Sequence, residues 1–178
     1  HERDPRLQAA ANRLFRNDGR GQFVAVEAVA ADEGYGRGAS VADYDNDGFP
    51  DLFVGNWGED RLYRNNGDGT FSEVGAGIGL NDRRIGVSSS WADLDGDGWL
   101  DLYVVTYVLY DSATAPACLD PVANEFDFCH PNIFDGQSDI LYRNRGDGTF
   151  ADRSDALVGL VPVEGMGLAV GIGDLNGD

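Results

Sequence analysis

The sequence predicts an all-β fold built of β-propeller blades, with about three four-stranded repeat units that form an incomplete ring and carry calcium loops. Three observations lead to this fold class. One sequence unit occurs three times, and the first aspartates of its first two acidic blocks, Asp43 and Asp93, are 50 positions apart. Each unit contains short runs of strand-forming residues. Glycine makes up 25 of the 178 residues without a collagen period, which indicates many tight turns.

The first element of the unit is a hairpin block. The stretch LFRNDGRGQF at 14–23 returns as LYRNNGDGTF at 62–71 and as LYRNRGDGTF at 141–150. In each copy, a run of alternating apolar and polar residues is followed by a glycine-rich turn and then by a second short run of strand-forming residues. This is the pattern of a β-hairpin. The sequence therefore predicts three such hairpins.

The second element is an acidic block followed by a buried strand. VADYDNDG at 41–48 returns as WADLDGDG at 91–98 and as IGDLNGD at 172–178. The apolar runs at 52–54 and 100–105 are typical of buried strands, and the small residues at 87–92 suit a strand near a crowded axis. This gives roughly four strands per ~50 residues, the repeat length of a propeller blade.

The unit boundaries follow from these blocks. We expect one propeller segment over 1–178, with repeat units at about 12–54, 60–105 and 138–178 and an insertion at 106–137. Three units do not close a ring, because propellers use ~4–8 blades. We therefore expect the missing blades to come from a longer natural chain or from other subunits.

The acidic blocks predict metal sites. Carboxylates occupy positions 1, 3, 5 and 9 of the first two loops, and alternate residues of a tight loop can point inward together while Gly48 or Gly98 lets the backbone turn. A backbone carbonyl at position 7 would complete an oxygen cage, and six to eight oxygen ligands suit Ca²⁺. The candidate ligands are Asp43, Asp45, Asp47, Phe49 and Asp51; Asp93, Asp95, Asp97, Trp99 and Asp101; and, in the partial third loop, Asp174, Asn176 and Asp178.

The acidic loops have three alternative interpretations. An EF-hand needs an acid at position 12 between two helices, whereas position 12 here is Val54 or Val104 in an expected strand. Zinc and copper favour cysteine or histidine, and no loop contains either. Turns of Asp and Gly without a metal are the remaining alternative, in which four carboxylates would raise one another's pKa values.

The insertion holds both cysteines of the chain. Ten residues separate Cys118 from Cys129 in a segment with little predicted regular structure, and a disulfide would stabilise it. Two free thiols, or a metal pair with His130, are the alternatives. A disulfide indicates an oxidising compartment. The insertion also carries aromatic residues that either bind a partner or pack on the neighbouring blade: Tyr107, Tyr110, Phe126, Phe128 and Phe134.

Charge and the remaining motifs exclude several function classes. The net charge of −18 and the absence of lysine argue against nucleic-acid binding, which calls for a basic face. The sequence contains no run of 18 apolar residues, so it does not predict membrane insertion. Arg145, Gly146 and Asp147 spell an adhesion tripeptide, but they fall in the repeated turn, so the repeat explains them. Arg16, Arg64 and Arg143 recur beside the loops and are expected to pair with loop carboxylates or carbonyls.

The two blocks together resemble the FG-GAP/VCBS repeats of integrin-type propellers, and most of all the ASPIC/UnbV group that includes cartilage acidic protein. The likeness rests on D-x-D-x-D-G-x-x-D in the acidic loops and on LYRN-x-GDGTF between them. It implies a calcium-stabilised propeller in secreted, cell-surface or periplasmic proteins. The resemblance carries the ligand role over only to the aspartates of the first two loops and to Asp174, Asn176 and Asp178.

These observations lead to one functional expectation and two alternatives. We expect a non-catalytic, calcium-binding module that serves adhesion, scaffolding or binding of a protein or glycan. A carbohydrate-active enzyme, or its accessory propeller, is the first alternative. A structural subunit of an extracellular fibre or layer, assembled from copies of itself, is the second.

Overall fold

A computed structural model describes residues 12–26, 35–111, 114–116, 118, 129–157 and 165–173. Within these residues the chain is all-β, with three short 3-10 turns and no helix long and apolar enough to cross a membrane. In chain order the elements are β1 (Leu14–Asn17), β2 (Phe23–Val26), β3 (Tyr35–Ala42), β4 (Asp51–Trp57), β5 (Arg61–Asn65), β6 (Phe71–Glu73), η1 (Gly75–Ile78), β7 (Gly86–Ala92), β8 (Asp101–Thr106), η2 (Pro131–Ile133), β9 (Ile140–Asn144), β10 (Phe150–Asp152) and η3 (Ser154–Leu157).

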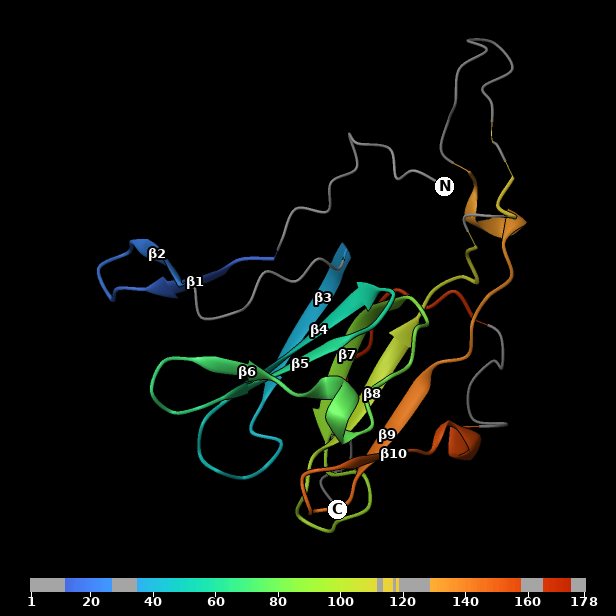
Figure 1. Cartoon of the computed structure of the whole chain (residues 1–178). Helices are drawn as coiled ribbons and strands as arrows, with labels where there is room; N and C mark the ends of the chain where they lie inside the picture. The colour runs from blue at the N-terminus through green and yellow to red at the C-terminus, as the bar shows by residue number, and fades with distance from the viewer. Residues whose placement is uncertain are drawn as a thin grey trace.

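The strands form three antiparallel sheets (Figure 1). β1 and β2 make a two-stranded sheet, β3-β4-β5-β6 a four-stranded sheet, and β7-β8-β9-β10 a second four-stranded sheet. Strands that follow one another in sequence are neighbours throughout each sheet, as in a meander. The predicted all-β class and four-stranded blades are confirmed.

The boundaries of the sequence repeats do not coincide with the boundaries of the sheets. β3 and most of β4 lie in the unit 12–54, whereas β5 and β6, which complete the same sheet, lie in the unit 60–105. Likewise, β7 and β8 are joined by β9 and β10 from beyond the insertion. β1 and β2 occupy the repeat positions of the last two strands of a blade. Hydrogen bonding therefore groups the end of one sequence unit with the start of the next.

The two four-stranded sheets share one apolar core. Leu102 and Val104 of β8 belong to the same buried cluster as Phe53 of β4, and all three side chains are fully buried. Burying each of these side chains contributes roughly 1.5–3 kcal/mol relative to leaving it exposed. The other members of the core are Tyr44, Leu62, Leu80, Ile140, Tyr142 and Phe150.

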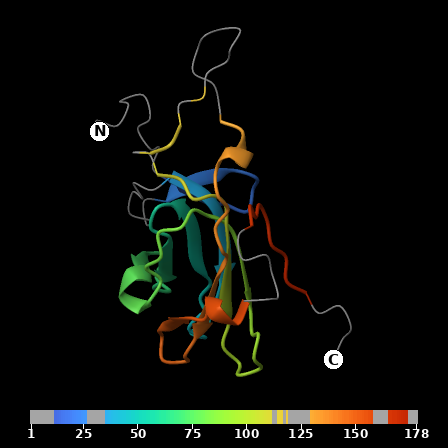
Figure 2. The same ribbon diagram turned by 90° about the vertical axis from the view of Figure 1, so that its right-hand side faces the viewer.

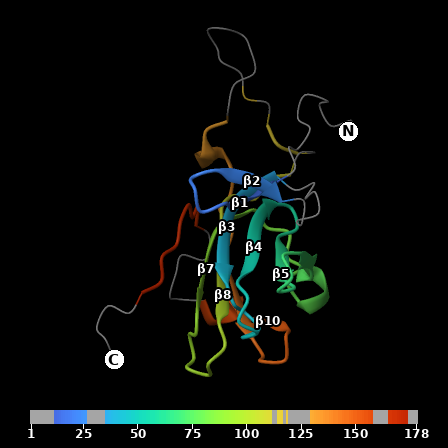
Figure 3. The same ribbon diagram turned by 90° about the vertical axis from the view of Figure 1, so that its left-hand side faces the viewer.

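β3 and β7 approach each other closely between the sheets, and small residues make this possible (Figure 3). A Cβ atom at Gly38 would overlap the carbonyl oxygen of Val87. The Ser40 and Ser89 hydroxyls are hydrogen-bonded at 2.6 Å, and Trp91 Nε1 donates to Ser40 Oγ at 2.9 Å. The small-residue strand predicted at 87–92 thus lies where two sheets meet tightly.

The insertion connects β8 to β9, two adjacent strands of the β7-β8-β9-β10 sheet. Cys118 and Cys129 form a disulfide with their Cα atoms 5.3 Å apart, which confirms the expected pairing over the thiol and metal alternatives. Tyr110 stacks edge-on against Trp57 at the end of β4, with ring centroids 4.7 Å apart, and Phe134 lies 5.6 Å from Tyr110. Tyr110 therefore packs on the neighbouring sheet and Phe134 packs on Tyr110, whereas Phe126 and Phe128 fall outside the described residues.

Candidate metal centre

Two acidic loops lie at the end of the sheets opposite to the insertion (Figure 2). The first, residues 43–50, joins β3 to β4, and the second, residues 93–100, joins β7 to β8. Both turn through residues in the left-handed region at positions 4 and 6: Asn46 (φ 54°) and Gly48 (φ 89°) in the first loop, Gly96 (φ 76°) and Gly98 (φ 88°) in the second. The strand ends on either side hold the loops in place.

In the first loop, backbone amides hold the carboxylates inward. Asp43 accepts hydrogen bonds from the amides of Asp47 at 3.0 Å and Gly48 at 2.9 Å. Asp51 opens β4 and is buried, and its Oδ2 accepts from the Tyr44 amide at 3.2 Å. The loop is therefore closed from both of its ends.

The second loop repeats these contacts. Asp93 accepts from the amides of Gly96 at 2.8 Å, Asp97 at 3.0 Å and Gly98 at 2.9 Å. Three amide donors, that of Gly98 foremost, lower the pKa of Asp93. Asp101 opens β8 as Asp51 opens β4, and its Oδ2 accepts from the Leu94 amide at 3.3 Å.

The carboxylates converge in both loops. Ligand oxygens of Asp43, Asp45 and Asp51 lie within 4.8 Å of one another, and so do those of Asp93, Asp95 and Asp97. Asp47 and Asp101 do not join these sets. The Asp47 carboxylate accepts from the Phe49 amide at 2.9 Å, as the Asp97 carboxylate accepts from the Trp99 amide at 2.9 Å. The position-7 carbonyls of Phe49 and Trp99 stay predicted ligands. Asp174, Asn176 and Asp178 lie outside the described residues.

The asparagine of each LYRN block connects its hairpin to the loop, a role that the sequence analysis missed. The Asn65 amide donates to Asp51 Oδ1 at 2.8 Å, and its Nδ2 donates to Pro50 O at 3.1 Å. The Asn144 amide donates to Asp101 Oδ1 at 2.9 Å, and its Nδ2 to Leu100 O at 3.2 Å. The return of this asparagine in all three copies of the hairpin block, as Asn17, Asn65 and Asn144, was a signal for its role.

The arginine of the same block faces the carboxylates, as predicted. Arg143 forms ion pairs with Asp95 and, at 3.5 Å, with Asp97. Arg64 Nε lies 3.9 Å from Asp45 Oδ2. Each loop has four carboxylates and one facing guanidinium, so a net negative charge is left beside the arginine.

Burial makes this charge costly. Desolvation, which outweighs two amide hydrogen bonds, raises the pKa of Asp51 to about 6, with a smaller contribution from the charges of Asp45 and Asp47. Burial likewise raises the pKa of Asp101 and of Asp45. A divalent cation among these oxygens would favour the ionised forms and reverse these shifts.

An aromatic ring at position 7 covers the hairpin turn in both sheets. A Cβ atom on Gly67 would come within 2.7 Å of the Phe49 ring, and one on Gly146 within 2.7 Å of Trp99 Nε1. Hydrogen bonds from Thr149, its hydroxyl foremost, lower the pKa of Asp147 and hold that carboxylate in the turn. The Arg-Gly-Asp tripeptide is thus part of the repeated turn.

We expect Gly146→Ala to destabilise the protein more than Gly148→Ala, as measured by urea unfolding. Both glycines have positive φ, 70° and 82°, so alanine is strained at each by roughly 1–2 kcal/mol. Only Gly146 lies beneath Trp99, whereas nothing lies within 4 Å of a Cβ at Gly148. Equal losses in the two variants would show that the ring does not press on the turn.

The FG-GAP-like repeat profile matches residues 7–54 and 43–104, which together span more than half of the chain. The chain belongs to the FG-GAP-like repeat family. No curated protein matches it. The two FG-GAP-like matches overlap at 43–54, the first acidic loop with the start of β4, and the second match also contains the loop at 93–100.

These FG-GAP-like repeats have a donor set that fits a hard divalent cation. Each loop brings three carboxylates together, and the described residues near them contain no thiolate or imidazole. Oxygen-only ligands select Ca²⁺, Mg²⁺ or Mn²⁺ over zinc and copper. Asp43, Asp45 and Asp51 would hold an ion in the first loop, and Asp93, Asp95 and Asp97 in the second.

A further acid precedes the third strand of each sheet. Asp60 accepts from the Asn56 amide at 2.8 Å, and Asp139 accepts from the Thr106 amide at 2.8 Å. Asp139 also accepts from the hydroxyl of Tyr103 at 2.8 Å, but the repeat places Phe53, which has no hydroxyl, at the matching position of the first sheet. Burial raises the pKa of Asp60 to about 7.

We expect Asp60 to lower the free energy of unfolding as the pH rises from about 4 to about 7. Its pKa in the folded state exceeds the ordinary 3.8, so the native state binds more protons in this window and loses stability as they dissociate. Asp60→Asn should remove this part of the pH dependence, roughly 2–4 kcal/mol at 1.36 kcal/mol per pKa unit. Urea unfolding at several pH values in saturating calcium measures it, with exposed Asp155→Asn as the control; equal pH slopes for wild type and Asp60→Asn would contradict it.

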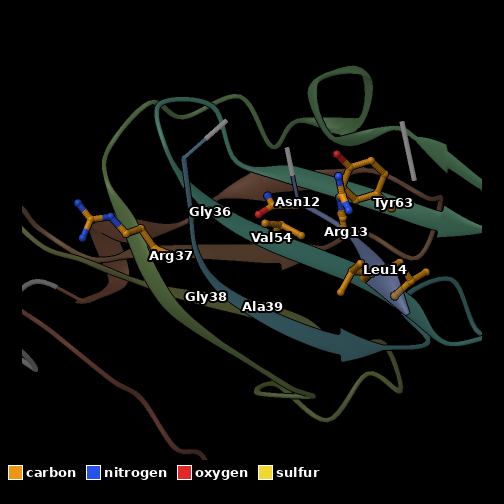
Figure 4. Close-up of a pocket in the computed structure, with 10 residues that line it drawn as sticks. Asn12, Arg13, Leu14, Gly36, Arg37, Gly38, Ala39, Val54 and Tyr63 are labelled. Carbon is orange, nitrogen blue, oxygen red and sulfur yellow. The ribbon is translucent and has the colours of Figure 1, made fainter. Parts of the chain in front are cut away.

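A pocket of about 380 Å³ lies between the β3-β4-β5-β6 sheet and residues 12–14 (Figure 4). Its lining includes Leu52 and Val54, which occupy the repeat positions of Leu102 and Val104. Leu102 and Val104 are buried in the core that their sheet shares with the preceding β3-β4-β5-β6 sheet. The pocket therefore corresponds to the space between blades, and we assign no ligand to it.

Proposed function

We propose that this chain is a calcium-binding, non-catalytic propeller module of an extracellular protein, in the ASPIC/UnbV group of FG-GAP-like proteins. The observation that carries the proposal is the convergence of three carboxylates in each of two equivalent loops. Each ion would join the end of one strand to the start of the next, so cation binding would be coupled to folding.

The disulfide supports the proposed extracellular location, and a group of exposed aromatic side chains supports the proposed binding of a protein or glycan. The disulfide between Cys118 and Cys129 favours an oxidising compartment. Tyr35 and Trp57 remain 54% and 41% exposed at the end that carries the insertion, with the guanidinium of Arg37 5.6 Å from both ring centroids. Exposed aromatics beside an arginine are typical of binding surfaces for proteins and glycans.

Calorimetric titration of the purified chain with calcium tests the proposal. We expect two sites within the described loops that prefer calcium to magnesium, and the loss of one site in each of Asp45→Ala and Asp95→Ala. Asp68→Ala, which removes an exposed carboxylate of a hairpin turn, is the matched control and should retain both sites. Two unchanged sites in Asp45→Ala and Asp95→Ala would refute the ligand assignment.

A glycan array with and without chelator tests the non-catalytic role. Saturable binding without product release supports an interaction module. Release of cleaved glycan would instead show a carbohydrate-active enzyme, and mass measurement showing a closed assembly of identical chains would show a structural subunit.

A further inference from the structure

The two acidic loops are hydrogen-bonded to each other. Nδ2 of Asn144 lies 2.9 Å from the carbonyl oxygen of Tyr44, in the first loop, and 3.2 Å from that of Leu100, in the second. A second link joins Asn46 Nδ2 to Gly98 O at 3.2 Å. Both links run between residues more than 50 positions apart in sequence, so they form only when the sheets are packed together.

Asn144 is fixed rigidly at this junction. The residue is 1% exposed, and its Oδ1 accepts from the Gly146 amide at 3.0 Å while its own amide donates to Asp101. Its side chain thus uses both donors and its acceptor. A buried amide with all its partners in place has one arrangement, because any rotation leaves buried polar groups unpaired.

The contacts form one continuous chain between the two loops. Asp51 Oδ2 accepts from the amide of Tyr44, whose carbonyl accepts from Asn144 Nδ2, and the Asn144 amide donates to Asp101 Oδ1. Tyr44 stands between Asp43 and Asp45, two of the convergent carboxylates. The position of the first loop's ligands is therefore tied to the fourth aspartate of the second loop.

We propose that Asn144, aided by Asn46, couples the two loops energetically, so that a cation bound in one loop raises the affinity of the other. This inference rests on the proposed function, since it concerns the same two sites. A cation that orders one loop fixes its end of the chain of hydrogen bonds and leaves less conformational freedom to be lost when the second loop is filled. By linkage the effect is reciprocal.

The first sheet supplies a natural control. Asn65 makes the same contacts to its own loop, through Asp51 and Pro50, and likewise accepts from the turn amide of Gly67 at 3.0 Å. Its Nδ2 makes no bond to a second acidic loop within the described residues. Asn65 and Asn144 therefore separate the support of one loop from the connection between two.

Calcium calorimetry on the full chain measures the coupling. The double variant Asp93→Asn/Asp95→Asn gives the association constant of the first loop alone, and Asp43→Asn/Asp45→Asn gives that of the second loop alone. The coupling is the ratio of the product of the two association constants in the protein with both loops to the product of these two single-loop constants. We expect this ratio to fall at least about fivefold, the lower end of typical coupling, when Asn144→Ala is added to every member of the set. Repulsion between ions is the same in both sets and cancels.

Two further variants keep the test decisive. Asn65→Ala should weaken the first loop but leave the ratio unchanged. Asn46→Gly puts into the first loop the residue that the second loop has at that position, Gly96, and removes only the Asn46 link. It should fold even if Asn144→Ala does not, and we expect it to lower the ratio by about twofold or more.

The outcomes separate the two proposals. No calcium binding by the wild-type chain would overturn the proposed function. Two occupied sites whose ratio is the same with and without Asn144 and Asn46 would overturn the coupling alone. A ratio lowered equally by Asn65→Ala and Asn144→Ala would also overturn it, because support of a single loop would then explain the effect.

Discussion

Removal of calcium by excess chelator is expected to lower the melting temperature of this FG-GAP-like chain by about 10–20 °C. Each ion held at 100 times its Kd stabilises the folded state by ~2.7 kcal/mol, and ~1 kcal/mol shifts the melting temperature of a domain this size by about 2–4 °C. The loss also follows from the carboxylates themselves, because the buried Asp51 and its neighbours would then face one another with only one arginine beside each loop.

Differential scanning calorimetry with and without chelator measures this effect. Calcium added back in excess should restore the melting temperature, whereas equimolar magnesium should restore less of it. Asp45→Ala and Asp95→Ala should each show part of the loss in calcium. A melting temperature that chelator leaves unchanged would mean that the loops are stable turns without an ion.

Phe53→Ala is expected to destabilise the protein by about 3–5 kcal/mol, the usual cost of truncating a buried phenylalanine. Phe53 is fully buried between the two four-stranded sheets, and its ring lies edge-on to Trp91 with centroids 6.3 Å apart. The cavity would open where both sheets meet, so the packing that positions both acidic loops would loosen.

Urea unfolding in saturating calcium tests this expectation, and Phe15→Ala is the control. Phe15 lies on β1 and is 49% exposed, so its truncation should change the free energy of unfolding by no more than ~0.5 kcal/mol. Similar losses in the two variants would show that the sheets do not share a core. Calcium affinity should fall in Phe53→Ala and remain unchanged in Phe15→Ala.

The acidic loops were predictable because their chemistry is local. Aspartates at alternate positions, followed by a glycine that adopts positive φ, converge within a single turn, and the structure brings together Asp43, Asp45 and Asp51 as well as Asp93, Asp95 and Asp97. The disulfide was predictable for a similar reason, since only ten residues separate Cys118 from Cys129. The difference between Asp60 and Asp139 was not predicted, because it depends on which strand residue faces each acid.

Strand content, repeat period and the convergence of three aspartates in each of two loops were thus determined by the sequence alone, because each depends on residues close together in the chain. The tertiary structure decided where a blade begins, since a period has no starting point until hydrogen bonds pair β5 with β4 and β9 with β8. It also decided that Asn144 joins two loops while Asn65 supports one. Such contacts join residues far apart in sequence, and only the packing of one sheet against the next brings them within bonding distance.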